Sequence, residues 1–316
     1  MRMNRWQTML VLTLVHTAAA GAATPRPARV PDWAAVLGAP DPQQVSPEGV
    51  VLVTNVRYAP QRAAVGDFYF PPGHALTAPP APCVMNIHGG GFTRGNHFNA
   101  QLNVGRDNMS EWLAQNGFAV FNINYTLLQR TADGGFAGGP VATMEEALQA
   151  LAFLRTNASR CNLDARRIAL MGGSAGATVA TMIGVLHPAG IRAVVAWSPF
   201  VNLADGFRQY QSYYVPEIRR HAGSVDMVRR KFGRLAKEYS AIHHVSSNAV
   251  PMFVYAGGRV DTPGMQKSAA AFVDQLSQNG RASIYAFLAD GEHAGGDKAL
   301  QTYGPQALRF LREANP

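Results

Sequence analysis

A short pattern around Ser174 constrains the fold of this chain more than any other feature. The apolar run 168–171 has the length of a buried strand, and Gly172, Ser174 and Gly176 follow it with the spacing Gly-x-Ser-x-Gly. The small, apolar segment 177–186 then has the composition of a buried helix. A strand, a tight turn and a helix predict a nucleophile elbow, in which the two glycines relieve crowding around a strained serine. The five-residue pattern also arises by chance in loops of small residues. Whether it marks a nucleophile elbow therefore depends on the motifs in the rest of the chain.

Apolar strands alternate with helical segments along most of the chain, which predicts an α/β fold. We expect the first two strands, 50–58 and 65–69, to form an antiparallel edge hairpin. Further strands are expected at 83–87, 118–124, 168–171, 191–197, 251–255 and 282–288, and helices at 108–116, 143–159, 177–186, 266–279 and 303–313. Strands separated by helices indicate a mostly parallel sheet with helices on both faces. In such sheets, functional groups gather at the carboxyl ends of the strands.

Several chemically active side chains follow expected strands within a few residues. A serine hydroxyl needs a base to take its proton, and that base is usually a histidine oriented by a carboxylate. We expect His293 to be the base, because it follows the last strand in a glycine-flanked loop. Asp261 follows strand 251–255 and is the expected acid, with Asp205 as the weaker alternative. The chain order Ser174, Asp261, His293 is that of nucleophile-elbow hydrolases.

A run of glycines follows strand 83–87 and is expected to bind a developing negative charge. The run reads His88-Gly89-Gly90-Gly91, and its backbone N–H groups are not shielded by Cβ atoms. We expect the N–H groups of Gly90, Gly91 and Ala175 to form an oxyanion hole, in which losing one donor raises the barrier by about 3 kcal/mol. His88 is expected to brace the loop rather than to act as the base. The competing interpretation is a tight loop without a chemical role.

In combination these motifs resemble the α/β-hydrolase superfamily, specifically the carboxylesterase and lipase branch with a His-Gly-Gly-Gly oxyanion motif. The chain is similar to hormone-sensitive-lipase-like and feruloyl-esterase-like bacterial enzymes over about residues 50–314. The resembling residues are His88 to Phe92, Asn124-Tyr125, Asn162 to Asp164, Arg167-Ile168, Gly172 to Gly176, Gly258, Asp261, Gly291 and His293. Ala177 and Thr262-Pro263 depart from the family pattern without removing a catalytic group.

The resemblance implies an α/β-hydrolase fold with a mostly parallel eight-stranded sheet, helices on both faces and a small cap insertion. It implies a Ser-His-Asp triad that hydrolyses carboxylic esters through an acyl-enzyme, without cofactor or metal. The expected function is therefore that of a serine carboxylesterase acting on a small-molecule ester. A serine exopeptidase, amidase or lactonase on the same fold is the alternative. A non-catalytic binding protein on this scaffold fits less well, because all three triad candidates are present.

Composition and segment boundaries complete the expected organisation. Residues 1–22 resemble a secretory signal peptide, with an n-region carrying Arg2 and Arg5, a short apolar core and small residues at 18–23, and they predict a secreted or periplasmic protein. Residues 23–49 are expected to be an N-terminal arm or linker, and 50–316 a hydrolase domain. No segment of the mature chain is expected to span a membrane. The net charge of +8 comes mostly from scattered Lys and Arg, so no nucleic-acid partner is expected.

The insertion at about 200–248 breaks the strand–helix rhythm and is the expected cap. Its aromatic residues are expected either to line an acyl or aromatic pocket or to pack the cap onto the domain: Phe207, Tyr210, Tyr213 and Tyr214. Cys83 and Cys161 are expected to lie together on the face opposite the active site, as a disulfide or as two buried free thiols. We find no His, Cys and Asp spacing typical of a metal site.

Overall fold

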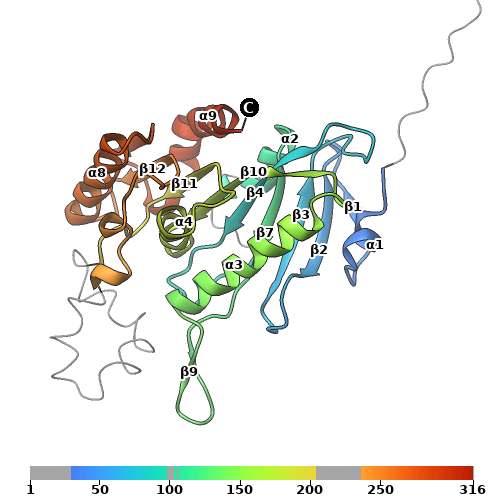
Figure 1. The fold of residues 1–316 in the computed structure, drawn as a ribbon, viewed down its shortest axis with the longest axis horizontal. Coiled ribbons are helices and arrows are strands. Elements are labelled where there is room, and N and C mark those ends of the chain that lie inside the picture. Colours follow the sequence, from blue (N-terminus) through green and yellow to red (C-terminus); the bar gives the residue numbers. More distant parts are fainter. Residues whose placement is uncertain (1–29, 98–102, 105–106, 204–235, 316) are drawn as a thin grey trace, which may run out of the picture.

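The computed structural model describes residues 30–97, 103–104, 107–203 and 236–315. In this part of the chain nine strands form one sheet, in the spatial order β1-β2-β3-β7-β4-β10-β11-β12-β13 (Figure 1). From β7 to β13 all neighbours are parallel, whereas the pairs β1–β2, β2–β3 and β3–β7 are antiparallel. The strand bounds are Gln44–Val45 (β1), Val51–Arg57 (β2), Val65–Phe70 (β3), Ala81–Ile87 (β4), Ala119–Ile123 (β7), Leu163–Gly173 (β10), Ala193–Trp197 (β11), Met252–Gly257 (β12) and Ile284–Leu288 (β13).

The predicted α/β class and the mostly parallel sheet are confirmed, and all eight expected strands are present. The sheet nevertheless has nine strands rather than eight, because β1 pairs with β2 through Gln44 opposite Leu52 and Val45 opposite Val51. The expected hairpin of β2 and β3 is antiparallel, but β1 covers its outer edge. A two-residue strand is too short to produce a readable alternation, which explains why the sequence did not predict it.

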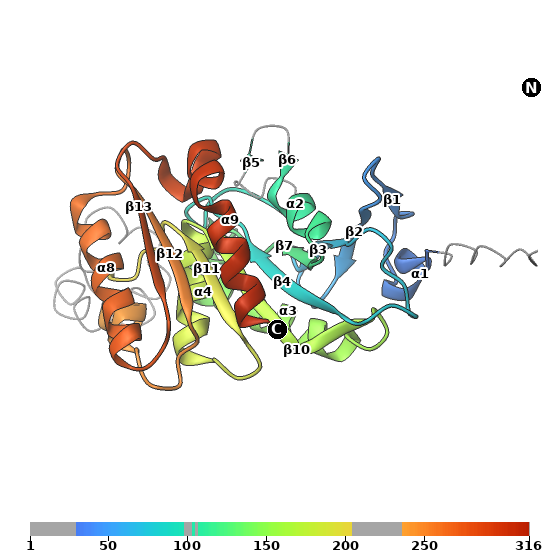
Figure 2. The same cartoon turned by 90° about the horizontal axis from the view of Figure 1, so that it is seen from above.

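Helices cover both faces of the sheet (Figure 2). On one face lie α1 (Trp33–Leu37), α3 (Pro140–Asn157), α4 (Ala175–Leu186) and α8 (Pro263–Gln278), and on the other α2 (Met109–Gln115) and α9 (Gly296–Ala314). The strand β11 shows how the sheet joins the two cores. Val194 and Ala196 belong to the first core, whereas Val195 and Trp197 belong to the second. All five of its residues are buried, which explains a continuous apolar run in place of alternation.

Four helices begin earlier than the sequence predicts. The helices α3 and α8 start at Pro140 and Pro263 instead of residues 143 and 266, because proline fits the first turn, where a backbone N–H has no helical partner. The helix α4 starts at Ala175 instead of residue 177. The helix α9 starts at Gly296 instead of residue 303. Its first turns are mostly polar and bury only a few side chains, among them Ala299 and Leu300, so their hydrophobic periodicity is weak.

The glycine-rich loop at 129–140 contains a small hairpin. Its strands are β8 (Gln129–Arg130) and β9 (Phe136–Ala137), and the hairpin extends away from the sheet (Figure 1). The guanidinium of Arg130 lies 5.5 Å from the centre of the Phe136 ring. Two further short strands, β5 (Asn103–Val104) and β6 (Asp107–Asn108), precede α2.

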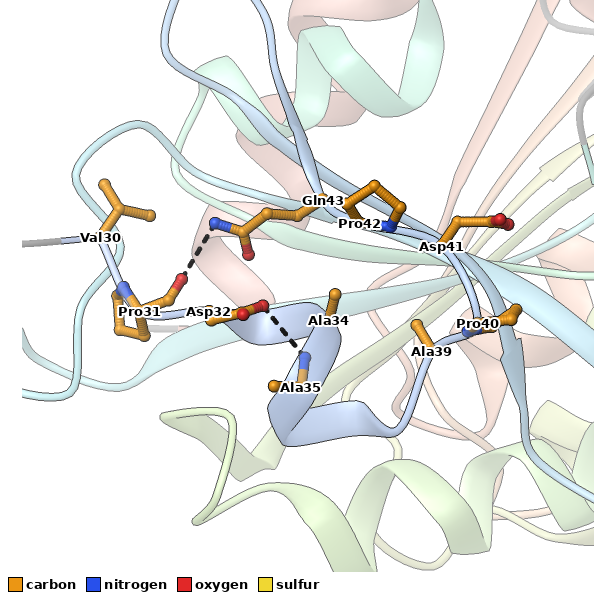
Figure 3. A pocket seen from close by; sticks show the side chains of 10 residues that line it. All are labelled: Val30, Pro31, Asp32, Ala34, Ala35, Ala39, Pro40, Asp41, Pro42 and Gln43. Atoms are coloured by element: carbon orange, nitrogen blue, oxygen red, sulfur yellow. Dashed lines mark hydrogen bonds between the residues drawn. The ribbon is translucent and has the colours of Figure 1, made fainter.

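Part of the expected N-terminal arm is packed onto the domain. The side chain of Trp33 is fully buried, and its ring lies 5.0 Å from those of Phe70 and His74. Gln43 links the two ends of this segment, since it accepts a hydrogen bond from the Trp33 N–H (2.7 Å) and donates one to the Pro31 carbonyl (3.1 Å). Between α1 and the returning chain lies a surface hollow of about 630 Å³ (Figure 3).

Both cysteines are buried free thiols near the amino ends of β4 and β10. Burial raises the pKa of Cys161 to about 11 and also raises that of Cys83, so neither is activated as a nucleophile. Of the two alternatives left open by the sequence, the structure has the free thiols. Across the described residues no helix is both long enough and apolar enough to cross a membrane.

Candidate active site

The serine predicted at the elbow occupies a strained turn between β10 and α4. Its φ and ψ angles are 54° and −114°, and its N–H donates to the Trp197 carbonyl at the end of β11 (2.8 Å). A Cβ atom on Gly172 would lie 2.5 Å from the backbone of Gly176, and one on Gly176 would lie 1.9 Å from the Ile87 carbonyl oxygen. The Gly-x-Ser-x-Gly spacing is therefore required by close backbone packing on both sides of Ser174.

The three predicted triad residues lie together at the carboxyl ends of their strands. The His293 Nε2 atom is 2.8 Å from Ser174 Oγ, and His293 Nδ1 is hydrogen-bonded to Asp261 Oδ1. Asp261 follows β12 and is 3% exposed, whereas His293 opens the short helix η3 (His293–Gly295) after β13 and keeps about a quarter of its side chain accessible. His293 is therefore accessible for proton exchange with a bound molecule, whereas the Asp261 carboxylate is shielded from solvent.

The second carboxylate oxygen of Asp261 has hydrogen-bond donors of its own. Its Oδ2 atom accepts from the Ser198 hydroxyl (2.6 Å) and from the Gly257 N–H (2.8 Å). Since a backbone N–H can only donate, Oδ2 acts as an acceptor towards Gly257. When Nδ1 donates to Asp261 Oδ1, the neutral ring keeps Nε2 as the acceptor that faces Ser174.

The glycine loop after β4 turns its carbonyl groups into the protein. The Tyr125 hydroxyl donates to the His88 carbonyl (3.0 Å), His88 Nδ1 donates to the Gly89 carbonyl (2.7 Å), and the Arg94 N–H donates to the Gly90 carbonyl (3.2 Å). In a trans peptide the C=O of one residue and the N–H of the next point in opposite directions. The N–H groups of Gly90 and Gly91 therefore point away from these internal partners. At the start of α4, the Ala175 N–H also has no helical acceptor.

His88 holds this loop in place. Its ring is buried and stacks on Tyr125 with ring centres 4.0 Å apart, and its Nε2 atom lies 3.2 Å from Oδ1 of Asn124. Burial lowers the pKa of His88 below its ordinary value, although the hydrogen bonds to Gly89 and Asn124 oppose the shift. The bracing interpretation of His88 agrees with these contacts.

The aromatic ring of Phe200 lies beside His293. Its ring centre is 6.0 Å from that of His293, and its N–H donates to Thr178 Oγ1 (3.0 Å). Thr178 Oγ1 in turn donates to the Ser174 carbonyl (3.0 Å). The alternative acid and the four expected pocket aromatics lie outside the described residues: Asp205, Phe207, Tyr210, Tyr213 and Tyr214.

Two residues of the site were not singled out from the sequence. Ser198 contacts the acid, and Gln266 Nε2 donates to the Asp261 carbonyl (2.6 Å) from the first turns of α8. Ser198 directly follows a parallel strand, so the rule that located the triad could have included it. Gln266 gave no such signal, because it lies inside a helix. In the described part of the chain, no group of three or more His, Cys, Asp or Glu side chains could hold a metal ion.

Comparison with known proteins identifies the sequence family. The sequence model of the BD-FAE family matches residues 67–273, which is more than half of the chain. No curated protein matches the sequence.

Solved structures with similar folds include several esterases. A Bacteroides eggerthii protein described as bifunctional GH43-CE has a TM-score of 0.65 at 19% identity, covering 86% of this chain and 36% of that one, so this chain spans about a third of its length. Esterase B from Lactobacillus Rhamnosis has a TM-score of 0.62 at 16% identity, covering 86% and 88%. Thermogutta terrifontis esterase 2, phosphoramylated by tabun, has a TM-score of 0.60 at 18% identity, covering 84% and 94%. At these identities the likeness shows the fold alone.

Proposed function

This chain belongs to the BD-FAE family of α/β-hydrolases, a family of feruloyl and acetyl esterases, and we propose that Ser174, His293 and Asp261 carry out its ester hydrolysis. The observation that supports this most strongly is the continuous hydrogen-bond chain from Ser174 Oγ through His293 to Asp261. Each member has the partner that its role requires, in the order nucleophile, base and orienting acid.

The proposed first half-reaction forms an acyl-enzyme. Ser174 Oγ attacks the ester carbonyl carbon while its proton moves to His293 Nε2. The negative charge that develops on the carbonyl oxygen is bound by the N–H groups of Gly90, Gly91 and Ala175. When the tetrahedral intermediate collapses, the C–O bond to the alcohol breaks and His293 returns the proton to the leaving oxygen.

The second half-reaction repeats these steps with water. Water gives a proton to His293 Nε2 and attacks the acyl carbon, and the Ser174 Oγ–acyl bond then breaks as the serine regains its proton. Asp261 remains ionised throughout, because it orients the ring and stabilises the imidazolium that forms twice per cycle. No step requires a metal or an organic cofactor.

Replacing the serine tests this assignment. We expect Ser174→Ala to reduce hydrolysis of p-nitrophenyl acetate by at least about 10⁴-fold, because the nucleophile of the covalent pathway is gone. Treatment with paraoxon should raise the mass of the protein, and peptide mapping should place the added group on Ser174. Thermogutta terrifontis esterase 2 is known in a form phosphorylated by this compound. Unchanged turnover by the variant would refute the mechanism, and wild type that stays unlabelled would favour a non-catalytic binding protein.

For the substrate we propose acetyl or feruloyl esters of carbohydrates. The family supports this class, and similar structures are described as a carbohydrate esterase from gut microbiota and as the bifunctional GH43-CE protein. A panel of methyl ferulate, acetylated xylo-oligosaccharides, simple lactones and aminoacyl amides tests it. Preference for the amides or lactones would favour the alternative hydrolase activities.

We also propose that the enzyme is exported, on the sequence of residues 1–22. The positive n-region, short apolar core and small residues at 18–23 support a cleaved signal peptide. N-terminal sequencing of material collected outside the cytoplasm should begin after this segment, and an intact Met1 or Arg2 on that material would contradict export.

A further inference from the structure

A buried serine joins the two loops that carry the acid and the base. Ser198 directly follows β11, is 1% exposed and has a φ of 55°, a left-handed conformation that side chains other than glycine adopt with strain. Its hydroxyl lies 2.6 Å from Asp261 Oδ2 and 2.9 Å from the backbone nitrogen of Ala294, the residue after His293. Its own N–H donates to the Tyr255 carbonyl in β12 (2.8 Å), which fixes where the hydroxyl is presented.

The direction of each hydrogen bond around this hydroxyl is determined by chemistry. The Ala294 N–H can only donate, so Ser198 Oγ accepts there. The hydroxyl has one proton, and it is therefore available for Asp261 Oδ2. As a result, one atom both keeps Oδ2 as an acceptor and anchors the backbone next to His293. Moving Ser198 would therefore disturb both Asp261 and the backbone that carries His293.

The strained backbone is consistent with a functional rather than a packing role. Glycine would adopt a φ of 55° without strain but would supply no hydroxyl, and alanine would keep the strain and lose both hydrogen bonds. Within the triad, Asp261 Oδ1 contacts His293 Nδ1, and His293 Nε2 contacts Ser174 Oγ. The hydroxyl at 198 thus supplies the link between the Asp261 loop and the His293 loop.

We propose that Ser198 is a positioning residue for the hydrolysis, which holds Asp261 as an ionised acceptor and fixes the His293 loop. The inference rests on the proposed function, because it assigns Ser198 a role through the triad. Ser198 itself lies behind Asp261 and does not touch the reacting atoms.

The test compares variants at 198 with a matched buried serine. We expect Ser198→Ala and Ser198→Gly each to lower kcat for p-nitrophenyl acetate by about 10- to 100-fold, the scale of losing a hydrogen bond to a charged group, with KM changed less than about 3-fold. Ser198→Gly relieves the backbone strain, so it keeps the test valid if the alanine variant folds poorly. The control is Ser110→Ala, which removes a fully buried hydroxyl bonded to Asn122 Oδ1 (2.8 Å) outside the triad and should leave kcat unchanged.

A spectroscopic measurement separates positioning from general destabilisation. The low-field proton resonance of the His293–Asp261 hydrogen bond should shift or broaden in both variants at 198 and remain unchanged in Ser110→Ala. Wild-type kcat in Ser198→Gly, or an equal loss in Ser110→Ala, would overturn the proposal. Ser174→Ala is measured alongside: if it keeps its activity the proposed function fails, whereas an inactive Ser174→Ala with fully active variants at 198 refutes only the role of Ser198.

Discussion

Backbone strain at single residues is concentrated around the site. Of the six described non-glycine residues with positive φ, four lie around the site and have φ between 54° and 62°: Phe92, Ser174, Ser198 and Ala294. The other two are Asn55 and Asn162. For residues other than glycine this region costs on the order of 1 kcal/mol each. The four residues around the site belong to the proposed oxyanion loop (residues 88–92), to the triad or to its direct contacts, so the surrounding hydrogen bonds hold the strained residues in the arrangement that the proposed reaction needs.

Gly90 gives a prediction at this scale. Its φ is 107°, and a Cβ atom there would lie 2.0 Å from the Arg94 carbonyl oxygen. Gly90→Ala would therefore force the oxyanion loop to shift, and with it the N–H groups of Gly90 and Gly91. We expect kcat for p-nitrophenyl acetate to fall by about 100-fold or more, the loss typical of one oxyanion donor.

The matched control for this prediction is Gly73→Ala. Gly73 also has a positive φ, 72°, but the space around its Cβ position is open. The control should lose about 1 kcal/mol of stability through the left-handed backbone and keep its activity. A Gly90→Ala enzyme as active as Gly73→Ala would show that this loop does not bind the oxyanion.

At the scale of elements, the sequence predicted which strands bring the candidate site residues together. Parallel strands deliver groups at their carboxyl ends, and Ser174, Asp261 and His293 each follow a strand within a few residues and lie within hydrogen-bonding distance of one another. The same rule was not applied to Ser198, whose role depends on the approach of two distant loops. The start of α9 and the strand β1 were missed because weak or very short patterns give no periodic signal.

Two hydrogen bonds connect the helix α3 to the oxyanion loop through the segment 126–128. Glu146 of α3 is 5% exposed, and its carboxylate accepts a hydrogen bond from the Thr126 N–H (2.9 Å) just after β7. Two residues later, the Leu128 N–H donates to the Phe92 carbonyl in the oxyanion loop (2.7 Å). The segment 126–128 thus connects α3 to the loop that we propose binds the developing charge.

Removing the Glu146 carboxylate should destabilise the protein. We expect Glu146→Ala to lower the free energy of unfolding by about 1–3 kcal/mol, because it leaves a partly buried N–H without its charged acceptor. The neighbouring Glu145→Ala removes an exposed carboxylate from the same helix and should change stability by less than about 0.5 kcal/mol. Urea denaturation measures both, and equal midpoints would show that Glu146 does not support this segment.

At the scale of the whole molecule, the sheet separates two hydrophobic cores, and the folded unit begins before residue 50. The first core includes Trp33 and Ala34 of α1 together with residues of α3, α4 and α8. Composition alone favoured an N-terminal arm or linker for residues 23–49, because the segment is rich in proline and alanine and has few large apolar side chains. The buried Trp33 and the pairing of β1 with β2 attach part of that segment to the domain.

The boundary of the folded unit can be tested through this tryptophan. Trp33 is fully buried and stacks on Phe70, so Trp33→Ala should lower the free energy of unfolding by about 3–5 kcal/mol, whereas Val45→Ala, at a position 59% exposed, should cost less than about 0.5 kcal/mol. A chain that begins at residue 50 should be destabilised, relative to one that begins at residue 30, at least as much as by Trp33→Ala. Because the triad lies at the far ends of β10, β12 and β13, kcat per folded molecule should be preserved in every variant. If the chain starting at residue 50 unfolds at the same urea concentration as the chain starting at residue 30, the arm is a linker after all.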